Sequence, residues 1–439
     1  MTEKMKPSGI TWIGDIPSEW EAKKIKYVIS DIKDGTHGTF DRVESGELLL
    51  SAKNVFDDGI HIGSNESEIS YSDYTSIVAN GYPQRNDVLL CCVGTIGRCC
   101  VYDFEKTLAF QRSVSFLRPL ANTVPSFLKY ALQSDSTTVQ EQLLLNKSAQ
   151  EGLYMGSVRE MVIAMPDTVS EQRAIADFLD TQCAKIDSMI ADIEKQIETL
   201  QKYKKSLITE AVTKGLDRSA PMKDSEIEWI GFIPEKWDCK KLKYIISEPL
   251  QYGANESGDD YREGHPRYIR ITDITEENTL KEEGKLSLPP DIAAPYILRD
   301  GDILFARSGA TVGKSFFYTT EYGLAAFAGY LIRAKINQDM ALPKFVYYST
   351  LGIGYENWKN TVFTQATIQN IGADKYAQFY VTLPGLEEQS GIVEYLDEKC
   401  ARIDDVVKNK QAQLFTMQQH KKSLIYEYVT GKKRVTEVN

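Results

Sequence analysis

Two long segments of the chain repeat apolar residues at a spacing of seven. The first runs from Ser170 to about Thr213 and begins with polar residues suited to a helix N-terminus. Its apolar positions are Leu179, Ile186, Ile193, Leu200 and Leu207. The second segment carries Leu396, Ile403, Met417 and Leu424, with Lys410 and His420 interrupting the stripe. Because this spacing places apolar residues on one helix face, we predict two long helices.

The segments at about 15–165 and 232–383 have a different pattern. Runs such as ELLLSAKNV, DVLLCCV and RSVSFLRP are short, favour β structure and are separated by Gly, Asp, Asn and Pro. PRYIRITDI, GDILFAR and the apolar run after Gly323 are their counterparts in the second segment. Short helices are predicted near 125–133 and 343–351. The expected fold is therefore α+β, with two mixed α/β modules.

The chain consists of two copies of a unit of about 217 residues. Residues 12–28, WIGDIPSEWEAKKIKYV, match residues 229–245, WIGFIPEKWDCKKLKYI, and Trp12 recurs as Trp229, 217 residues later. At the same offset, EQRAIADFLDTQCAKID at 171–187 matches EQSGIVEYLDEKCARID at 388–404, and KKSLITEAVT at 204–213 matches KKSLIYEYVT at 421–430. Collinear matches of this length indicate an internal repeat.

The repeat predicts how the two halves are arranged and where the domain boundaries lie. Two similar halves that end in matched helices predict a pseudo-twofold molecule in which the helices pair antiparallel, with the WIGDIPSEW segment near the C-terminal helix. The alternative is that each helix packs only on its own module. The expected domains are residues 1–165 and 217–383 for the modules and 166–216 and 384–439 for the helices. The modules diverge, which suggests that they perform two different tasks within one shared frame.

The composition favours a globular, cytoplasmic protein. Hydrophobic residues make up 42% and charged residues 26% of the chain. No run of about 18 uncharged apolar residues is present, and the start MTEKMKPSGITW lacks the apolar core of a signal peptide. The net charge of −11 counts against nucleic-acid binding but does not exclude it, because acidic surface elsewhere can mask a local basic face.

The cysteines predict buried thiols rather than a metal site. An odd number in a chain without an export signal indicates free thiols in a reducing compartment. Adjacent cysteines in a strand point to opposite faces, which fits a buried strand better than a shared metal. The seven are Cys91, Cys92, Cys99, Cys100, Cys183, Cys239 and Cys400.

No catalytic or cofactor-binding pattern is complete. GATVGKS at 309–315 resembles a phosphate-binding loop, but only three residues separate Gly309 from Gly313 where that loop needs four. The chain has neither the Asn-Pro-Pro run nor the Pro-Cys pair expected of a DNA methyltransferase. Its four histidines are scattered. We therefore predict no catalytic residue, no metal and no cofactor.

The duplicated WIGxIPxxW starts, the GTIG- and SGATVG-type turns and the EQ…LD…ID…KKSLI helices together resemble the specificity subunits of type I restriction–modification enzymes. The resemblance covers nearly the whole chain. It implies that each module is a target recognition domain for one half of a split sequence in double-stranded DNA. It further implies that the helices form a rigid spacer that docks two methyltransferase subunits, and that restriction subunits with translocase activity join the complex.

The candidate DNA contacts lie at three places in each module, where polar side chains or glycine turns can approach bases or phosphates. The early loops offer Thr36 and His37 in the first module and Tyr252 and Asn255 in the second. The end of the following strand offers Lys53 and Asn54, or Arg270 and Thr272. The glycine turns offer Thr95 and Arg98, or Arg307, Ser308, Thr311 and Lys314, and Arg112 and Gln365 are further candidates.

Each of these residues has a simpler interpretation as a polar loop residue without a contact, and His37 as a structural histidine. The function also has an alternative from another class. The modules could form a scaffold that binds proteins or RNA without DNA specificity, which the acidic balance favours slightly.

Overall fold

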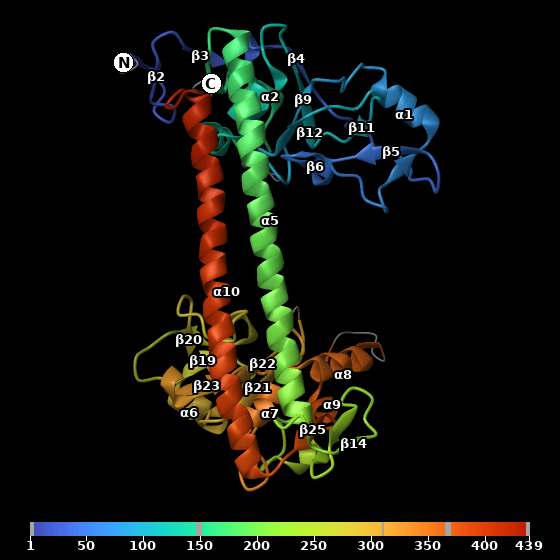
Figure 1. The fold of residues 1–439 in the computed structure, drawn as a ribbon, viewed down its shortest axis with the longest axis vertical. Coiled ribbons are helices and arrows are strands. Elements are labelled where there is room, and N and C mark those ends of the chain that lie inside the picture. Colours follow the sequence, from blue (N-terminus) through green and yellow to red (C-terminus); the bar gives the residue numbers. More distant parts are fainter. Residues whose placement is uncertain (1–3, 146–151, 310, 365–369, 436–439) are drawn as a thin grey trace. The chain divides into compact units, whose positions relative to one another are not determined.

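The computed structural model describes residues 4–145, 152–309, 311–364 and 370–435 (Figure 1). They divide into two compact units, and each is considered by itself. Unit 1 comprises residues up to 194 together with those from 412 onwards, and unit 2 comprises residues 195–411. The chain therefore enters and leaves unit 2 through helices that begin or end in unit 1.

Unit 1 contains the first module. Its strands are β1 (Met5–Pro7), β2 (Asp15–Pro17), β3 (Glu21–Lys24), β4 (Ile29–Asp34), β5 (Glu47–Leu50), β6 (Val55–Phe56), β7 (Gly59–Ile60), β8 (Glu68–Ile69), β9 (Val88–Cys91), β10 (Cys99–Val101), β11 (Ala109–Phe110), β12 (Val114–Pro119) and β13 (Val162–Met165). Its helices are α1 (Tyr71–Val78), α2 (Pro125–Gln133), α3 (Asp135–Leu144), α4 (Met155–Glu160) and the start of α5 (Val169–Lys214).

Unit 2 contains the second module. Its strands are β14 (Met222–Asp224), β15 (Phe232–Pro234), β16 (Asp238–Lys241), β17 (Gln251–Tyr252), β18 (Asp259–Asp260), β19 (Arg267–Ile269), β20 (Leu286–Ser287), β21 (Ile303–Ala306), β22 (Ser315–Phe317), β23 (Ala325–Phe327), β24 (Leu331–Ala334) and β25 (Tyr380–Leu383). Its helices are α6 (Pro290–Ala293), α7 (Pro343–Ser349), α8 (Ile353–Thr364), α9 (Ala373–Tyr376) and the start of α10 (Leu386–Val429).

The two modules share one sheet topology, which confirms the internal repeat. The first has a four-stranded antiparallel sheet in the order β10-β9-β12-β4, and the second has β22-β21-β24-β17. Each also has a second sheet with one parallel pair, β5 with β11 and β19 with β23. Both modules are thus built on the same mixed α/β plan, as the sequence predicts.

The adjacent cysteines are buried, as predicted: Cys91, Cys99 and Cys100 lie in strands, and Cys92 directly follows β9. Cys91 and Cys100 contribute to one apolar core, while Cys92 and Cys99 contribute to another on the opposite side of the same strands. Burial raises the pKa of the Cys91 thiol to about 11 and that of Cys100 to about 12. No cluster of metal-binding side chains is found among the described residues.

Within each unit the two long helices run antiparallel. In unit 1 the rings of Phe178 on α5 and Tyr428 on α10 lie 4.5 Å apart between centroids. Nearer the middle of the helices, Lys421 pairs with Asp187. Partners later in α5 therefore lie earlier in α10, and in unit 2 Lys204 and Asp404 continue this order. The predicted pairing is confirmed inside each unit.

The predicted helix seam is buried mainly near the modules. Leu179, Ile186, Leu396, Ile403 and Leu424 are buried. Ile193, Leu200, Leu207 and Met417 are only half-buried. Near the end of α5, Ile208 rather than Leu207 enters the core of unit 2. A straight α-helix has 3.6 residues per turn, so a strict spacing of seven drifts around its surface, and the module core selects the neighbouring residue.

The WIGxIPxxW segments join the module cores to the helices. Trp20 is fully buried, and its Nε1 donates to Glu171 Oε2 at 3.2 Å. Trp237 repeats this bond to Glu388 at 3.0 Å. In unit 1 the hydroxyl of Tyr426 on α10 donates to the carbonyl of Ile13. The N-terminal segment thus packs against the C-terminal helix, as expected from the repeat.

Candidate nucleic-acid interface

The early loop of the first module is fixed by its backbone to the loop that precedes β12. The Thr36 N–H donates to Phe110 O at 2.8 Å, and the Arg112 N–H donates to Thr36 O at 2.9 Å. A Cβ atom at Gly35 would lie 2.3 Å from Gln111 O, so only glycine permits this approach. The arrangement places two predicted contacts, Thr36 and Arg112, side by side and leaves the His37 side chain exposed.

The second module repeats this geometry with other side chains. The Ala254 N–H donates to Phe327 O at 2.9 Å, and the Gly329 N–H donates to Ala254 O at 2.6 Å. A Cβ atom at Gly253 would lie 2.3 Å from Phe327 O. Tyr252 and Asn255 flank this point and are exposed. The same backbone frame therefore presents His37 in one module and Asn255 in the other.

The second predicted place is a helical turn rather than the end of a strand. After β5 the chain forms a 3-10 turn, Ala52–Asn54, and after β19 it forms the equivalent turn, Ile271–Asp273. A side chain closes each turn. Asn54 Oδ1 accepts from Ser51 N–H at 3.1 Å, and Asp273 Oδ2 accepts from Arg270 N–H at 2.8 Å. These local bonds compete with strand extension.

This turn separates the predicted contacts into exposed and internal residues. Lys53 and Thr272 are exposed, although Lys53 Nζ lies 2.7 Å from Glu66 Oε2. Asn54 is buried, and its Nδ2 donates to His61 O and to Glu66. The Arg270 guanidinium bonds twice to Asp273. In this conformation Asn54 and Arg270 shape the turn and do not project from it.

The glycine turn of the first module packs against the 3-10 turn at Ala52–Asn54. Gly94 and Gly97 adopt positive φ angles of 82° and 87°, which glycine tolerates better than other residues. The hydroxyl of Thr95 donates to Ala52 O at 3.4 Å, which joins this turn to the 3-10 turn. Arg98 is exposed, with its guanidinium 4.9 Å from the centre of the Phe56 ring.

The glycine turn of the second module divides its predicted contacts. The Arg307 N–H donates to Tyr330 O at 3.0 Å, and Ser308 forms a bridge with Asn370. Thr311 Oγ1 is buried, and Lys314 Nζ donates to Thr275 O. Burial lowers the pKa of Lys314. Arg307 and Ser308 therefore lie toward the early loop, while Thr311 and Lys314 are held inside the turn.

Asn54, Arg270, Thr311 and Lys314 are set aside because they are held within the turns, and we group the remaining candidates into one face on each module. We call these the recognition faces. The first consists of Thr36, His37, Lys53, Thr95, Arg98 and Arg112, and the second of Tyr252, Asn255, Thr272, Arg307 and Ser308. Gln365 lies outside the described residues.

Three aromatic residues that lie beside these faces, Phe56, His61 and Tyr330, were not predicted from the sequence. Phe56 supports Arg98 and stacks on His61, with ring centroids 4.3 Å apart. Tyr330 is 64% exposed, next to Arg307. An aromatic residue in or near a short strand is typical of a buried core, so the sequence does not reveal that Phe56 is only half-buried and that Tyr330 is exposed. Phe56 lies two residues after the predicted contact Asn54, whereas neither His61 nor Tyr330 has a predicted contact within five residues in the sequence.

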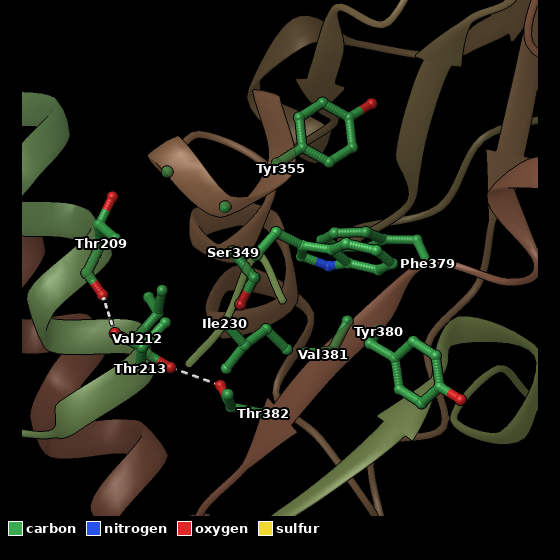
Figure 2. A pocket seen from close by; sticks show the side chains of 13 residues that line it. Thr209, Val212, Thr213, Ile230, Ser349, Tyr355, Phe379, Tyr380, Val381 and Thr382 are labelled. Atoms are coloured by element: carbon green, nitrogen blue, oxygen red, sulfur yellow. Dashed lines mark hydrogen bonds between the residues drawn. The ribbon is translucent and has the colours of Figure 1, made fainter. Parts of the chain in front are cut away.

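A cavity in unit 2 is too small to be a ligand site. Its volume is about 20 Å³, which is about the space of one water molecule. Figure 2 shows the turn of α5 at Val212 and Thr213 opposite Thr382 on β25, where the Thr382 hydroxyl donates to Val212 O. The cavity belongs to the junction of helix and module. No helix in the described part of the chain is long and apolar enough to cross a membrane.

The known proteins that this chain resembles are specificity subunits of type I restriction enzymes. Residues 234–432 match the family model described as type I restriction modification DNA specificity domain. A putative type I restriction enzyme MjaX specificity subunit of Methanocaldococcus jannaschii is 25% identical over 454 residues, which cover 97% of this chain and 96% of that one. The EcoBI specificity subunit of Escherichia coli is 25% identical over 295 residues, which cover 65% of this chain and 59% of that one.

A solved structure supports the fold. A chain from a structure describing complex assembly and conformational transition of the type I restriction–modification system superposes with a TM-score of 0.64. It is 14% identical, and the match covers 95% of this chain and 99% of that one. Residues 234–432 thus match the type I DNA specificity domain, and the chain as a whole is similar to the specificity subunits of type I restriction enzymes.

Proposed function

We propose that this chain is the non-catalytic DNA recognition subunit of a type I restriction–modification complex. Each module binds one half of a two-part target in double-stranded DNA through its recognition face. The helices separate the modules and dock two methyltransferase subunits, and restriction subunits join them. The functional division follows residues 1–165 and 217–383 for the modules and 166–216 and 384–439 for the helices.

One observation carries this proposal: the same backbone frame presents different polar side chains in the two modules. Gly35 and Gly253 make equivalent close approaches to the neighbouring strand, yet the residues beside them differ. Donors and acceptors that reach base edges determine which sequence is bound. Two similar frames with unlike side chains therefore suit two unlike half-sites, and the family supports DNA as the ligand.

The negative net charge of the chain supports a role for partner subunits in contacting the DNA phosphates. The net charge is −11, while affinity for DNA comes largely from cationic contacts with phosphates. In the first recognition face Lys53 is paired with Glu66. We infer that the partner subunits supply much of the phosphate contact, and that this chain supplies the base contacts.

The modular arrangement is tested by exchanging residues 30–150 for the same region of a relative with another target. Methylated adenines are then mapped by sequencing DNA from cells that contain the chimaera and its partner subunits. One half of the methylated sequence should change while the other half and the gap stay the same. A change in both halves would contradict the assignment of one half-site to each module.

The scaffold alternative is tested by gel shift with and without the methyltransferase partner. A DNA recognition subunit should bind its target more tightly than random duplex, and its affinity should fall as salt rises. A scaffold for protein or RNA should show neither effect on duplex DNA.

A further inference from the structure

Arg307 is the arginine of the second recognition face whose guanidinium lies against an aromatic ring. The guanidinium carbon lies 4.9 Å from the centre of the Tyr252 ring, which is itself 40% exposed. Tyr252 is held in turn, because its hydroxyl accepts a hydrogen bond from the Ala373 N–H at 3.0 Å. A cation over an aromatic face is attracted to it. The ring therefore orients the guanidinium before any ligand is present.

The Arg307 guanidinium has no hydrogen-bond partner among the described residues, and its Nε is buried without one. Neighbouring arginines of this module are engaged: Arg267 bonds to Glu282, and Arg333 bonds to Gln251 and Ile297 O. A buried donor without a partner costs free energy. Arg307 is thus an oriented donor group whose bonding capacity is unused within the module.

The equivalent backbone position in the first module carries a different residue. The Ile371 N–H donates to Arg307 O at 2.8 Å, and the Leu153 N–H donates to Cys92 O at 2.8 Å in the same place. Cys92 is buried at 3% exposure and packs in the core. The first module instead stacks Arg98 on Phe56, from the other side of its glycine turn. The oriented arginine therefore occupies different places on the two faces.

We propose that Arg307 recognises a guanine in the half-site bound by the second module, with Tyr252 as its positioning residue. This inference rests on the proposed function. The fork of an arginine matches the O6 and N7 acceptors of guanine in the major groove, and an arginine whose plane is already fixed loses less freedom on binding. The other four exposed or half-buried residues of this face are neutral, which leaves Arg307 as its cation.

The test uses the full chain with its methyltransferase partners. The methylated sequence is mapped in cells for the wild-type chain, R307A, R307K and, as a matched variant in the first module, R98A. R307A and R307K should relax the requirement for G·C at one position in one half of the target. The preference for that base pair over the others should fall about tenfold or more. R98A should leave that position unchanged. Y252F keeps the ring but loses the bond from Ala373, so it should weaken the preference less than Y252A does.

Modified DNA tests the same contact without altering the protein. Replacing that guanine by 7-deazaguanine removes N7 and should lower wild-type binding, while R307A should not distinguish the two duplexes. An R307A complex that keeps the full base preference would overturn the inference, as would one that binds all sequences equally less tightly, which indicates a phosphate contact. A wild-type complex that methylates no two-part sequence would instead contradict the proposed function.

Discussion

Lys421 Nζ on α10 lies 2.7 Å from Asp187 Oδ1 on α5. The repeat places the same pair in unit 2 with the roles of the helices exchanged, because Lys204 on α5 lies 2.6 Å from Asp404 on α10. Asp187 and Asp404 are 217 residues apart, as are Lys204 and Lys421. The LD…ID…KKSLI pattern therefore encodes one inter-helix ion pair twice, and this explains why a lysine and an aspartate recur in it.

These pairs should contribute modestly to stability and chiefly to the choice of partner helix. The side chains are partly exposed, Lys421 at 23% and Asp187 at 47%, so K421A should lower the free energy of unfolding by about 1 kcal/mol or less. K421D alone should cost more, because two carboxylates then face each other. The double variant K421D/D187K should recover most of the loss in a chemical denaturation experiment. No recovery would mean that the pair does not form.

Gly35 and Gly253 should be intolerant of any side chain. G35A and G253A place a Cβ 2.3 Å from a backbone carbonyl oxygen, and backbone cannot move aside cheaply. Each variant should lose about 3 kcal/mol of stability and should impair binding to one half-site only. G391A is the control, since a Cβ there meets nothing within 4 Å of the rest of the structure. It should be neutral or stabilising by up to about 1 kcal/mol in thermal denaturation.

Glu141 should make the first module less stable as pH rises. Burial raises the pKa of this carboxyl to about 7 from an ordinary value of 4.5, and its Oε1 has no hydrogen-bond partner among the described residues. Between these two values the folded chain binds more protons than the unfolded chain, so stability falls as pH rises through this window. E141Q should therefore raise the melting temperature at pH 8 and raise it less at pH 5.

E160Q is the control for this pH effect. Lys24 and Lys26 lower the pKa of the exposed Glu160 to about 2, so this carboxyl is ionised in both folded and unfolded chains above pH 5. Any effect of E160Q should be the same at pH 5 and pH 8. If E141Q likewise shows no difference between the two pH values, Glu141 ionises normally and the burial argument fails.

Seven residues inserted into both α5 and α10 should lengthen the gap between the half-sites. Insertions after 194 and after 411 keep the helix faces matched, and seven residues extend a helix by about 10 Å, or about three base pairs of duplex. The methylated sequence should show the longer gap. An insertion in α5 alone should abolish assembly instead. An unchanged gap in the double insertion would show that the helices do not set the spacing.

The sequence predicted the helices most accurately, because their signal is local and long. The heptad positions and Ser170 place the first long helix within a residue or two of Val169–Lys214, and the short helix at Pro125–Gln133 was predicted over the same range. The seam was predicted less well at its ends. Whether Leu207 or Ile208 enters the core depends on the module surface that the helix meets, and heptad spacing carries no information about that surface.

The sequence located the loops that form the candidate sites, but it did not show which of their side chains are exposed. The glycine patterns located the loops that meet, but the pairing of β5 with β11 joins residues about 60 apart through strands of at most four residues, and no local pattern specifies it. The alternation of apolar and polar residues also does not show that the Asn54 side chain is buried while that of Lys53 is exposed. The stacking of Arg307 on Tyr252 likewise depends on contacts between distant loops.

The core of unit 1 includes Leu424, Ile425 and Val429 beside Ile13 and Trp20. During synthesis on the ribosome, that core can close only after residues 424–429 have emerged. Residues 195–411 are contiguous and can complete their own core earlier. A premature stop after 411 would leave the first module with an open apolar surface, so the module that is synthesised first completes its core last.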